Sequence, residues 1–159
     1  MKKTILKVCV TSLVITGSLV SVQSQTGTQK PARTERRVVK LPGRTSTAPI
    51  SPAIVAGELV FTSGQIGIDP KTGQMVEGGL QAEAEQVLVN LKTVLEAAGS
   101  DMTRVLKTTV FLADMNDYAA MNEVYRRHFK DDPPARSAVQ VAKLPANAKI
   151  EIEAVALLK

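Results

Sequence analysis

Two stretches of the chain repeat apolar residues at the spacing of an amphipathic helix. In the first, LQAEAEQVLVNLKTVLEAAG, apolar residues recur every three or four positions, and Gly99 supplies a natural C-terminal stop. The second begins near Asp114 or Asn116, either of which can cap it, and ends before Pro133 and Pro134. The buried stripe expected for this second helix consists of Met115, Tyr118, Met121, Tyr125 and Phe129.

The segments around these helices have the patterns of strands. ELVFTSGQIGID, TRVLKTTVFLAD, ARSAVQVA and AKIEIEAVALL are rich in β-branched or alternating apolar residues, and RRVVKL can add one more strand. This order predicts an α+β fold in which two helices cover one face of a single mixed β-sheet. The other sheet face also carries apolar residues, so we expect further copies of the chain to cover it.

The beginning of the chain has the layout of a signal peptide over residues 1–24. Two lysines precede a mostly apolar run over residues 4–22, and the small residue Ser24 marks the expected cleavage site. Lys7 and several hydroxyl side chains make this run a poor membrane span, and a retained anchor is the alternative. We therefore expect export to the periplasm or the exterior, with no stable membrane span after cleavage.

Residues 25–44 are polar, basic and interrupted by Pro and Gly, which predicts that most of them form a flexible linker before a folded domain over residues 45–159. The formal net charge of the chain is +5, a value that by itself suggests a nucleic-acid partner. The excess is confined to the leader and the linker, because 11 basic and 14 acidic residues follow Arg44. The domain itself is acidic, so we expect it to have no nucleic-acid partner.

The sequence offers few side chains for metal or nucleophilic chemistry. Cys9, the only cysteine, lies in the expected signal peptide, so the mature protein would have no thiol. His128, the only histidine, stands at the end of the second helix, where a solvated position that complements the helix dipole is expected. No glycine-rich loop has nucleotide-binding spacing. Because the mature chain would have a single histidine and no thiol, we expect no metal site.

Arg136 is the leading candidate for ligand binding. It begins a strand directly after the stiff segment Pro133-Pro134-Ala135, and its guanidinium can hold a carboxylate through two parallel hydrogen bonds. A surface salt bridge is the alternative that spacing alone allows. Glu151 and Glu153 lie two apart on the last strand and so face the same side. They can orient water or move a proton, or they can be solvated surface.

Ser63 and Asn122 complete the set of candidates. Ser63, Gly64 and Gln65 are expected in the middle of a strand, where a glycine often marks a close approach of backbone. Asn122 is expected to face inward on the second helix, and a partly buried amide needs hydrogen-bond partners.

These stretches together resemble the RidA family, also called the YjgF or L-PSP endoribonuclease family, over about residues 46–159. The matching segments are API-SPA, the AG before ELVFTSGQI, DPKTG, QVLVNLKTVLEAAG, VLKTTVFLADMNDYAAMNEVY, PPARSAVQVAKLP and KIEIEAVA. The resemblance implies a chorismate-mutase-like fold and a homotrimer with its sites in the clefts between subunits. The open sheet faces would then form a central barrel.

The resemblance also implies an enamine/imine deaminase that needs neither a metal nor an organic cofactor. Its substrates would be 2-aminoacrylate and related 2-imino acids such as 2-iminobutanoate and 2-iminopropanoate, which it would hydrolyse to 2-keto acids and ammonia. Arg136 would bind the substrate carboxylate, and Glu151 would position or activate the attacking water. Ser63 and Asn122 match the family's serine and asparagine at the substrate site.

The chain departs from the resemblance at two positions. Ala53 stands where well-studied members have a tyrosine, which would remove one wall and one hydroxyl from the pocket, and Ala138 stands where they have a cysteine. The Ala53 replacement and the expected export favour a second hypothesis, a non-catalytic module that binds a carboxylate or another metabolite. Cleavage of RNA, suggested by the family's older name, is a third, and the acidic domain and single histidine argue against it.

Overall fold

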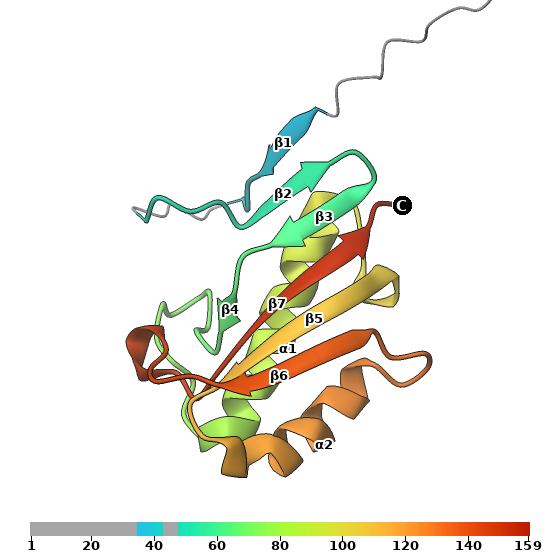
Figure 1. Ribbon diagram of the computed structural model, residues 1–159. Coiled ribbons are helices and arrows are strands. Elements are labelled where there is room, and N and C mark those ends of the chain that lie inside the picture. Colours follow the sequence, from blue (N-terminus) through green and yellow to red (C-terminus); the bar gives the residue numbers. More distant parts are fainter. Residues whose placement is uncertain (1–34, 43–47) are drawn as a thin grey trace, which may run out of the picture. The chain divides into compact units, whose positions relative to one another are not determined.

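The computed structural model describes residues 35–42 and 48–159, and the expected signal peptide with its cleavage site lies outside them. The elements follow in the order β1 (Arg36–Val39), β2 (Ala53–Ala56), β3 (Leu59–Thr62), β4 (Gln65–Ile66), α1 (Gly79–Ala98), β5 (Val105–Leu112), α2 (Tyr118–His128), β6 (Ala135–Gln140) and β7 (Ile150–Leu157) (Figure 1). Short 3-10 turns lie at Met102–Arg104, Met115–Asp117 and Pro145–Asn147. The strand predicted within RRVVKL is confirmed as β1.

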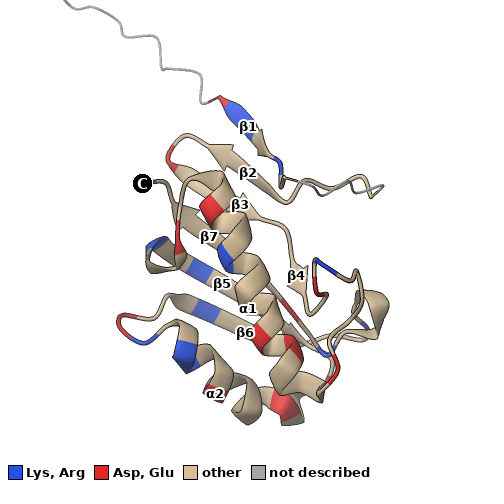
Figure 2. Ribbon diagram, turned by 180° about the vertical axis from the view of Figure 1, so that it is seen from behind, with Lys and Arg blue, Asp and Glu red and all other residues tan. Residues whose placement is uncertain are grey.

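The strands form a single sheet in the order β1-β2-β3-β7-β5-β6, and the short strand β4 pairs with β7 beside this path. Neighbouring strands run antiparallel except β5 and β6, which are parallel. Both helices lie on the same face of the sheet (Figures 1 and 2). The predicted α+β fold, with two helices on one face of a mixed sheet, is therefore confirmed.

The long helix α1 packs an apolar face on the sheet. Val87, Leu91 and Leu95 lie on this face and are completely buried. The helix ends at Gly99, as predicted, because this residue adopts a φ of 91° in the left-handed region and its N–H caps the last turn.

Two polar side chains on the buried face of α1 tie the helix to the neighbouring backbone. The Nδ2 of Asn90 donates to the carbonyl oxygens of Ile66 and Ile68, at 3.1 and 2.8 Å. Glu83 Oε2 accepts a 2.7 Å hydrogen bond from the backbone N–H of Lys149, just before β7. These bonds fix β4 and the beginning of β7 against the helix, and this region carries Glu151.

The second helix, α2, connects the parallel strands β5 and β6. A parallel pair needs such a crossover, and the helix packs on the same sheet face as α1. The predicted buried stripe is confirmed for Met121, Tyr125 and Phe129, but it is wrong for Met115 and Tyr118, which are 38% and 40% exposed. Met115 belongs to a 3-10 turn before the helix, and Tyr118 is the first helical residue, so neither reaches the core.

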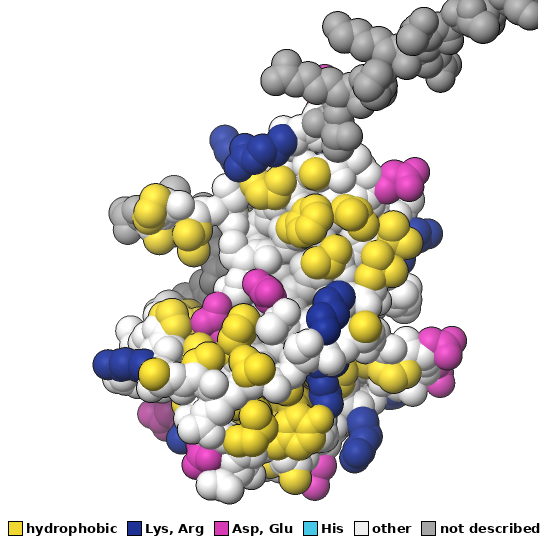
Figure 3. All heavy atoms as spheres, in the orientation of Figure 1, with side chains coloured by type: hydrophobic (Ala, Val, Ile, Leu, Met, Phe, Trp, Pro, Cys, Tyr) yellow, Lys and Arg dark blue, Asp and Glu magenta, His cyan; other side chains and the backbone are white. Residues whose placement is uncertain are grey.

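The face of the sheet opposite the helices carries many apolar side chains, as the strand patterns predicted. Along β7 the even-numbered residues are buried toward the helices, whereas Glu151, Glu153 and Val155 point to the other side. Val38, Phe61 and Val139 on this open face are 39%, 43% and 44% exposed. Figure 3 shows that apolar side chains are spread over this face, with a few charged groups between them.

Within the described residues, no helix is both long and apolar enough to cross a membrane.

Candidate active site

Arg136 lies on β6, at the edge of the sheet, and its side chain packs against α2. Its Cζ is 4.5 Å from the centre of the Tyr125 ring and 5.5 Å from that of Tyr118. The Nη2 group donates to Oδ1 of Asn122 at 2.7 Å and to the hydroxyl of Tyr118 at 3.2 Å, while Nη1 lies 3.7 Å from Met121 Sδ. The guanidinium is therefore held in place by α2.

Every group that holds this guanidinium is neutral. The ion pairs found among the described residues involve Glu85, Glu96 and Asp101, and none includes Arg136. Within the described part of the chain, the surface salt bridge that spacing alone allowed for Arg136 is therefore not formed. A guanidinium positioned by aromatic rings and an amide keeps its full charge, so it can bind an anion from outside the subunit.

Asn122 faces inward, as predicted, and its hydrogen-bond partner is Arg136. The two residues lie on different elements, α2 and β6, and the 2.7 Å bond between them fixes the direction of the guanidinium fork. Ala138 lies two residues further along β6, on the same face as Arg136, and packs against the core.

Glu151 lies on β7 and points to the open face of the sheet together with Glu153, as predicted. Burial raises the pKa of the Glu151 carboxyl above its ordinary value, and the negative charge of Glu153 adds to this shift. A carboxylate with a raised pKa is a stronger base near neutral pH than an ordinary glutamate. Glu151 is therefore suited to accept a proton from water.

Gly64 gives the Glu151 side chain its place. A Cβ atom at this position would overlap the Glu151 carboxyl, so any larger residue would displace that group. Ser63 and Gly64 were predicted in the middle of a strand, and this is wrong. They lie in the break between β3 and β4. The break arises because β4 pairs with β7 in a different register from β3.

Ser63 binds the loop that precedes β2. Its hydroxyl donates to the carbonyl oxygen of Ser51 at 2.7 Å, and its N–H donates to that of Pro52 at 2.9 Å. A cavity of about 960 Å³ opens beside this contact. Its lining includes Ser51, Pro52, Ser63 and Gly64, but neither Arg136 nor Glu151. Ser63 is thus adjacent to the Glu151 region and remote from Arg136 within one subunit.

A single chain does not bring Arg136 and Glu151 together. Arg136 is level with Thr108 of β5, whose side chain is buried toward the helices, whereas Glu151 is level with Phe111. Because side chains alternate along a strand, residues three apart face opposite sides of the sheet. Arg136 therefore lies on the helix side near α2, and Glu151 lies on the open face.

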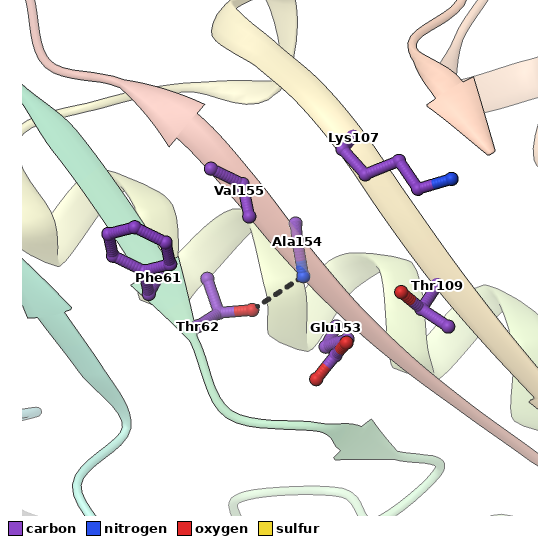
Figure 4. A pocket seen from close by; sticks show the side chains of 7 residues that line it. All are labelled: Phe61, Thr62, Lys107, Thr109, Glu153, Ala154 and Val155. Atoms are coloured by element: carbon purple, nitrogen blue, oxygen red, sulfur yellow. Dashed lines mark hydrogen bonds between the residues drawn. The ribbon is translucent and has the colours of Figure 1, made fainter. Parts of the chain in front are cut away.

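A small hollow of about 170 Å³ lies on the open face, beside Lys107, Thr109 and Glu153 (Figure 4). Thr62 borders it and accepts a 2.9 Å hydrogen bond from the backbone N–H of Ala154. Glu153 thus lies beside this hollow on the open face, two residues along β7 from Glu151.

Two other expectations change in the structure. Ala53 has its side chain in the hydrophobic core, 1% exposed, because it is an inward residue of β2. It therefore does not form part of a pocket wall, and the predicted loss of a wall at this position is wrong. His128 ends α2, as predicted, but its side chain is only 18% exposed, because its Nε2 makes a 2.8 Å contact with Glu85 Oε1 on α1. Burial acts to raise the pKa of Glu85, but hydrogen bonds from Arg127 and His128 outweigh it and lower the pKa.

Tyr118 and Tyr125 also contact Arg136, which the sequence pattern did not indicate. Tyr118, Met121, Asn122 and Tyr125 stand at helical spacing and share the face of α2 that meets Arg136. The same spacing was interpreted as a stripe of the core.

Among the described residues, no group of three or more His, Cys, Asp or Glu side chains is placed to hold a metal ion.

Comparisons with known proteins show which family the chain belongs to. A sequence model of the family described as Endoribonuclease L-PSP matches residues 41–158. The human protein named 2-iminobutanoate/2-iminopropanoate deaminase is 50% identical over 125 residues, which cover 77% of this chain and 90% of that protein. A protein of the RutC family from Pyrococcus horikoshii is 54% identical over 108 residues, 68% of this chain and 86% of its own length.

Solved structures show the same fold. RidA from an Antarctic Psychrobacter has a TM-score of 0.72 and 38% sequence identity, and the match covers 77% of this chain and 99% of that one. The same values describe the match to TdcF of E. coli, whose crystal structure contains bound serine. With a family model over most of its length and a relative that is half identical, this chain belongs to the endoribonuclease L-PSP family, to which RidA also belongs.

Proposed function

We propose that the protein is an imine deaminase that hydrolyses small 2-imino acids. In this reaction water adds to the C=N carbon and the C–N bond then breaks, which yields a 2-keto acid and ammonia. The names of the human, rat and mouse relatives, which are 50% to 51% identical, support this activity. The substrates that these names give, 2-iminobutanoate and 2-iminopropanoate, are the compounds that we expect this protein to use.

The observation that carries the proposal is the neutral surrounding of Arg136. Its charge has no acidic partner among the described residues, and its fork is fixed by Asn122 and Tyr118. A planar guanidinium in this state favours a carboxylate, which it can bind through two parallel hydrogen bonds. The serine bound in the related TdcF structure carries such a carboxylate.

Glu151 is the group that we assign to the water molecule. An imine carbon is already electrophilic, so hydrolysis needs a held substrate, a placed water and a base of suitable pKa. Glu151 has a raised pKa and lies in the space that Gly64 leaves open. Its carboxylate accepts a proton from the attacking water and can return it to the departing nitrogen.

The two groups act together only if separate subunits supply them, since they lie on opposite sides of one sheet. We therefore propose a homotrimer in which Arg136 of one subunit faces Glu151 of the next. The exposed apolar side chains of Val38, Phe61 and Val139 on the open face support an assembly that covers this face.

Phe61→Glu is expected to break this assembly. The wild type should behave in light scattering as three copies of the 17.0 kDa chain, less any leader that is removed. A glutamate at this 43% exposed position would place a charge in the covered apolar face. The variant should therefore run as a monomer and lose turnover, whereas Val89→Glu, at an exposed position of α1, should stay trimeric. A trimeric, active Phe61→Glu variant would contradict the proposed interface.

Gly64→Ala is expected to lower kcat/KM by about tenfold or more with little change in the melting temperature. The added methyl overlaps the flexible end of Glu151, which can swing away at small cost to folding but then leaves the water site. Steady-state kinetics and thermal unfolding check this directly. Gly73→Ala is the control for activity, because a Cβ at Gly73 meets nothing within 4 Å; this variant should keep its kcat/KM, although the φ of 71° at this position should lower its melting temperature.

The direct test of the function couples an amino-acid oxidase to the purified protein. The oxidase converts 2-aminobutyrate to 2-iminobutanoate, and the decay of the imine is followed with and without the protein. Faster decay that scales with protein concentration supports the deaminase. The non-catalytic binding module predicts a thermal shift with 2-oxobutanoate but no effect on imine decay. This alternative loses one of its supports, since Ala53 lies in the core and not in a pocket wall.

Export of the protein is also part of the proposal, and its support is the signal-like layout of residues 1–24. We expect the protein recovered from the periplasm or the culture medium to begin near residue 25. Intact mass spectrometry measures this N-terminus. A chain that keeps Met1 and is found only inside the cell would contradict export, and it would leave the deaminase proposal unaffected.

A further inference from the structure

A buried pair of hydroxyl groups lies directly beneath Arg136. Tyr125 is 5% exposed and Thr108 is completely buried, and their side-chain oxygens are 2.7 Å apart. Thr108 is also the residue of β5 that stands level with Arg136 of β6. The strand that carries the arginine and the ring that supports it are therefore fixed at the same point of the sheet.

The Tyr125 ring supports the guanidinium without neutralising it. Its centre is 4.5 Å from Cζ of Arg136, closer than the 5.5 Å of the exposed Tyr118 ring. Burial raises the pKa of the Tyr125 phenol, although the Thr108 hydrogen bond and the Arg136 charge oppose this, so the group is neutral at physiological pH. A carboxylate in this position would instead satisfy Arg136 and compete with a ligand.

The hydrogen bonds of Arg136 leave part of its fork open. Asn122 and Tyr118 both accept from Nη2, and Nη1 contacts only the sulfur of Met121. The Nε group has no hydrogen bond to any residue that the structure describes. The guanidinium thus lies over the Tyr125 ring, while donors at its edge are free for a carboxylate.

We propose that Tyr125 is a positioning residue whose ring, 4.5 Å from Cζ of Arg136, orients the guanidinium for the substrate carboxylate and leaves its charge available. The inference rests on the proposed deaminase function, because it assigns Tyr125 to the binding step of that reaction. It extends the site inward from the guanidinium to a ring and a hydroxyl that never touch the substrate.

Three variants separate the ring from the hydroxyl. Tyr125→Leu removes the ring, Tyr125→Phe keeps it, and Tyr125→Phe with Thr108→Val removes both hydroxyls without leaving one unpaired. We expect Tyr125→Leu to raise KM for 2-iminobutanoate about tenfold with kcat changed by less than about threefold, since cation–π contacts contribute on this scale and the carboxylate is bound throughout the reaction. Both variants that keep the ring should stay within about threefold of the wild-type KM.

Val87→Ala is the matched control, because Val87 is a completely buried core residue of α1 and belongs to no part of the site. It should lower the melting temperature as Tyr125→Leu does, but KM should not change. Calorimetric titration with 2-oxobutanoate repeats the comparison without turnover, and Tyr125→Leu should weaken this binding about tenfold.

The results distinguish the two proposals. If the wild type hydrolyses the imine and Tyr125→Leu has the same KM, the positioning role is overturned and the deaminase stands. If the wild type binds 2-oxobutanoate but hydrolyses nothing, the deaminase fails, and the calorimetric comparison alone decides the role of Tyr125. Loss of binding in Tyr125→Phe as severe as in Tyr125→Leu would also overturn it, as would a wild type that binds no carboxylate.

Discussion

Arg136→Ala is expected to lower kcat/KM for 2-iminobutanoate hydrolysis by about a hundredfold or more. The variant loses two charge-assisted hydrogen bonds to the substrate carboxylate, each of which contributes about 1.5–3 kcal/mol. At about 1.4 kcal/mol for each factor of ten, the lower end of this range already gives a hundredfold loss. The measurement is the rate of imine decay in the oxidase-coupled assay, over a series of substrate concentrations.

Two further substitutions make the result specific. Arg136→Lys keeps the charge but not the planar fork, so we expect activity between those of the wild type and the alanine variant. Arg126→Ala removes an arginine from the exposed side of α2 and should leave kcat/KM unchanged. Wild-type activity in Arg136→Ala would show that the substrate carboxylate is bound elsewhere.

Glu151→Gln is expected to lower kcat by about a hundredfold or more while the substrate still binds. The amide keeps the size of the side chain but cannot accept the proton of the attacking water, and general bases contribute on this scale. The matched control is Glu153→Gln, which removes the neighbouring charge on the same strand face. That variant should remain active, and the acid limb of its pH profile should move to lower pH, because Glu153 helps to raise the pKa of Glu151.

Glu151→Gln should not destabilise the fold. A carboxyl whose pKa is higher in the folded than in the unfolded state binds its proton more tightly when folded. The ionised form therefore costs stability, and this cost appears as the pH rises from the ordinary pKa of glutamate through the raised pKa of Glu151. At neutral pH, Glu151→Gln should melt at the same or a higher temperature than the wild type. A large drop in melting temperature would instead indicate a structural role for this carboxylate.

Local sequence patterns were sufficient to predict the fold. The apolar spacing of α1, its end at Gly99 and the alternation along β7 each follow from a single segment and its burial. The pattern failed at Met115 and Tyr118, because helical spacing continues through the turn before α2 although the sheet does not extend beneath it. Periodicity describes one element, and it does not show where the neighbouring element ends.

The arrangement of the candidate site could be predicted only in part, for a related reason. Arg136, Asn122 and Glu151 remain predictions as site residues. The sequence does not give the register of β5 with its two neighbours, and that register places the arginine and the glutamate on opposite faces. Tyr125 was assigned to the core and indeed lies there, yet its ring also supports Arg136. Ala53 was interpreted as a missing pocket wall, because a motif position does not show which way its side chain points.

The central claim is that Arg136 of one subunit works with Glu151 of another, and subunit mixing tests it most directly. Equal amounts of Arg136→Ala and Glu151→Gln chains, each inactive alone, are unfolded together and refolded. Random assembly places an intact Arg136 beside an intact Glu151 at about a quarter of the interfaces, so about a quarter of wild-type activity should return if trimers form as proposed. If the mixture stays as inactive as its two components, although light scattering shows that mixed trimers form, the shared site is contradicted.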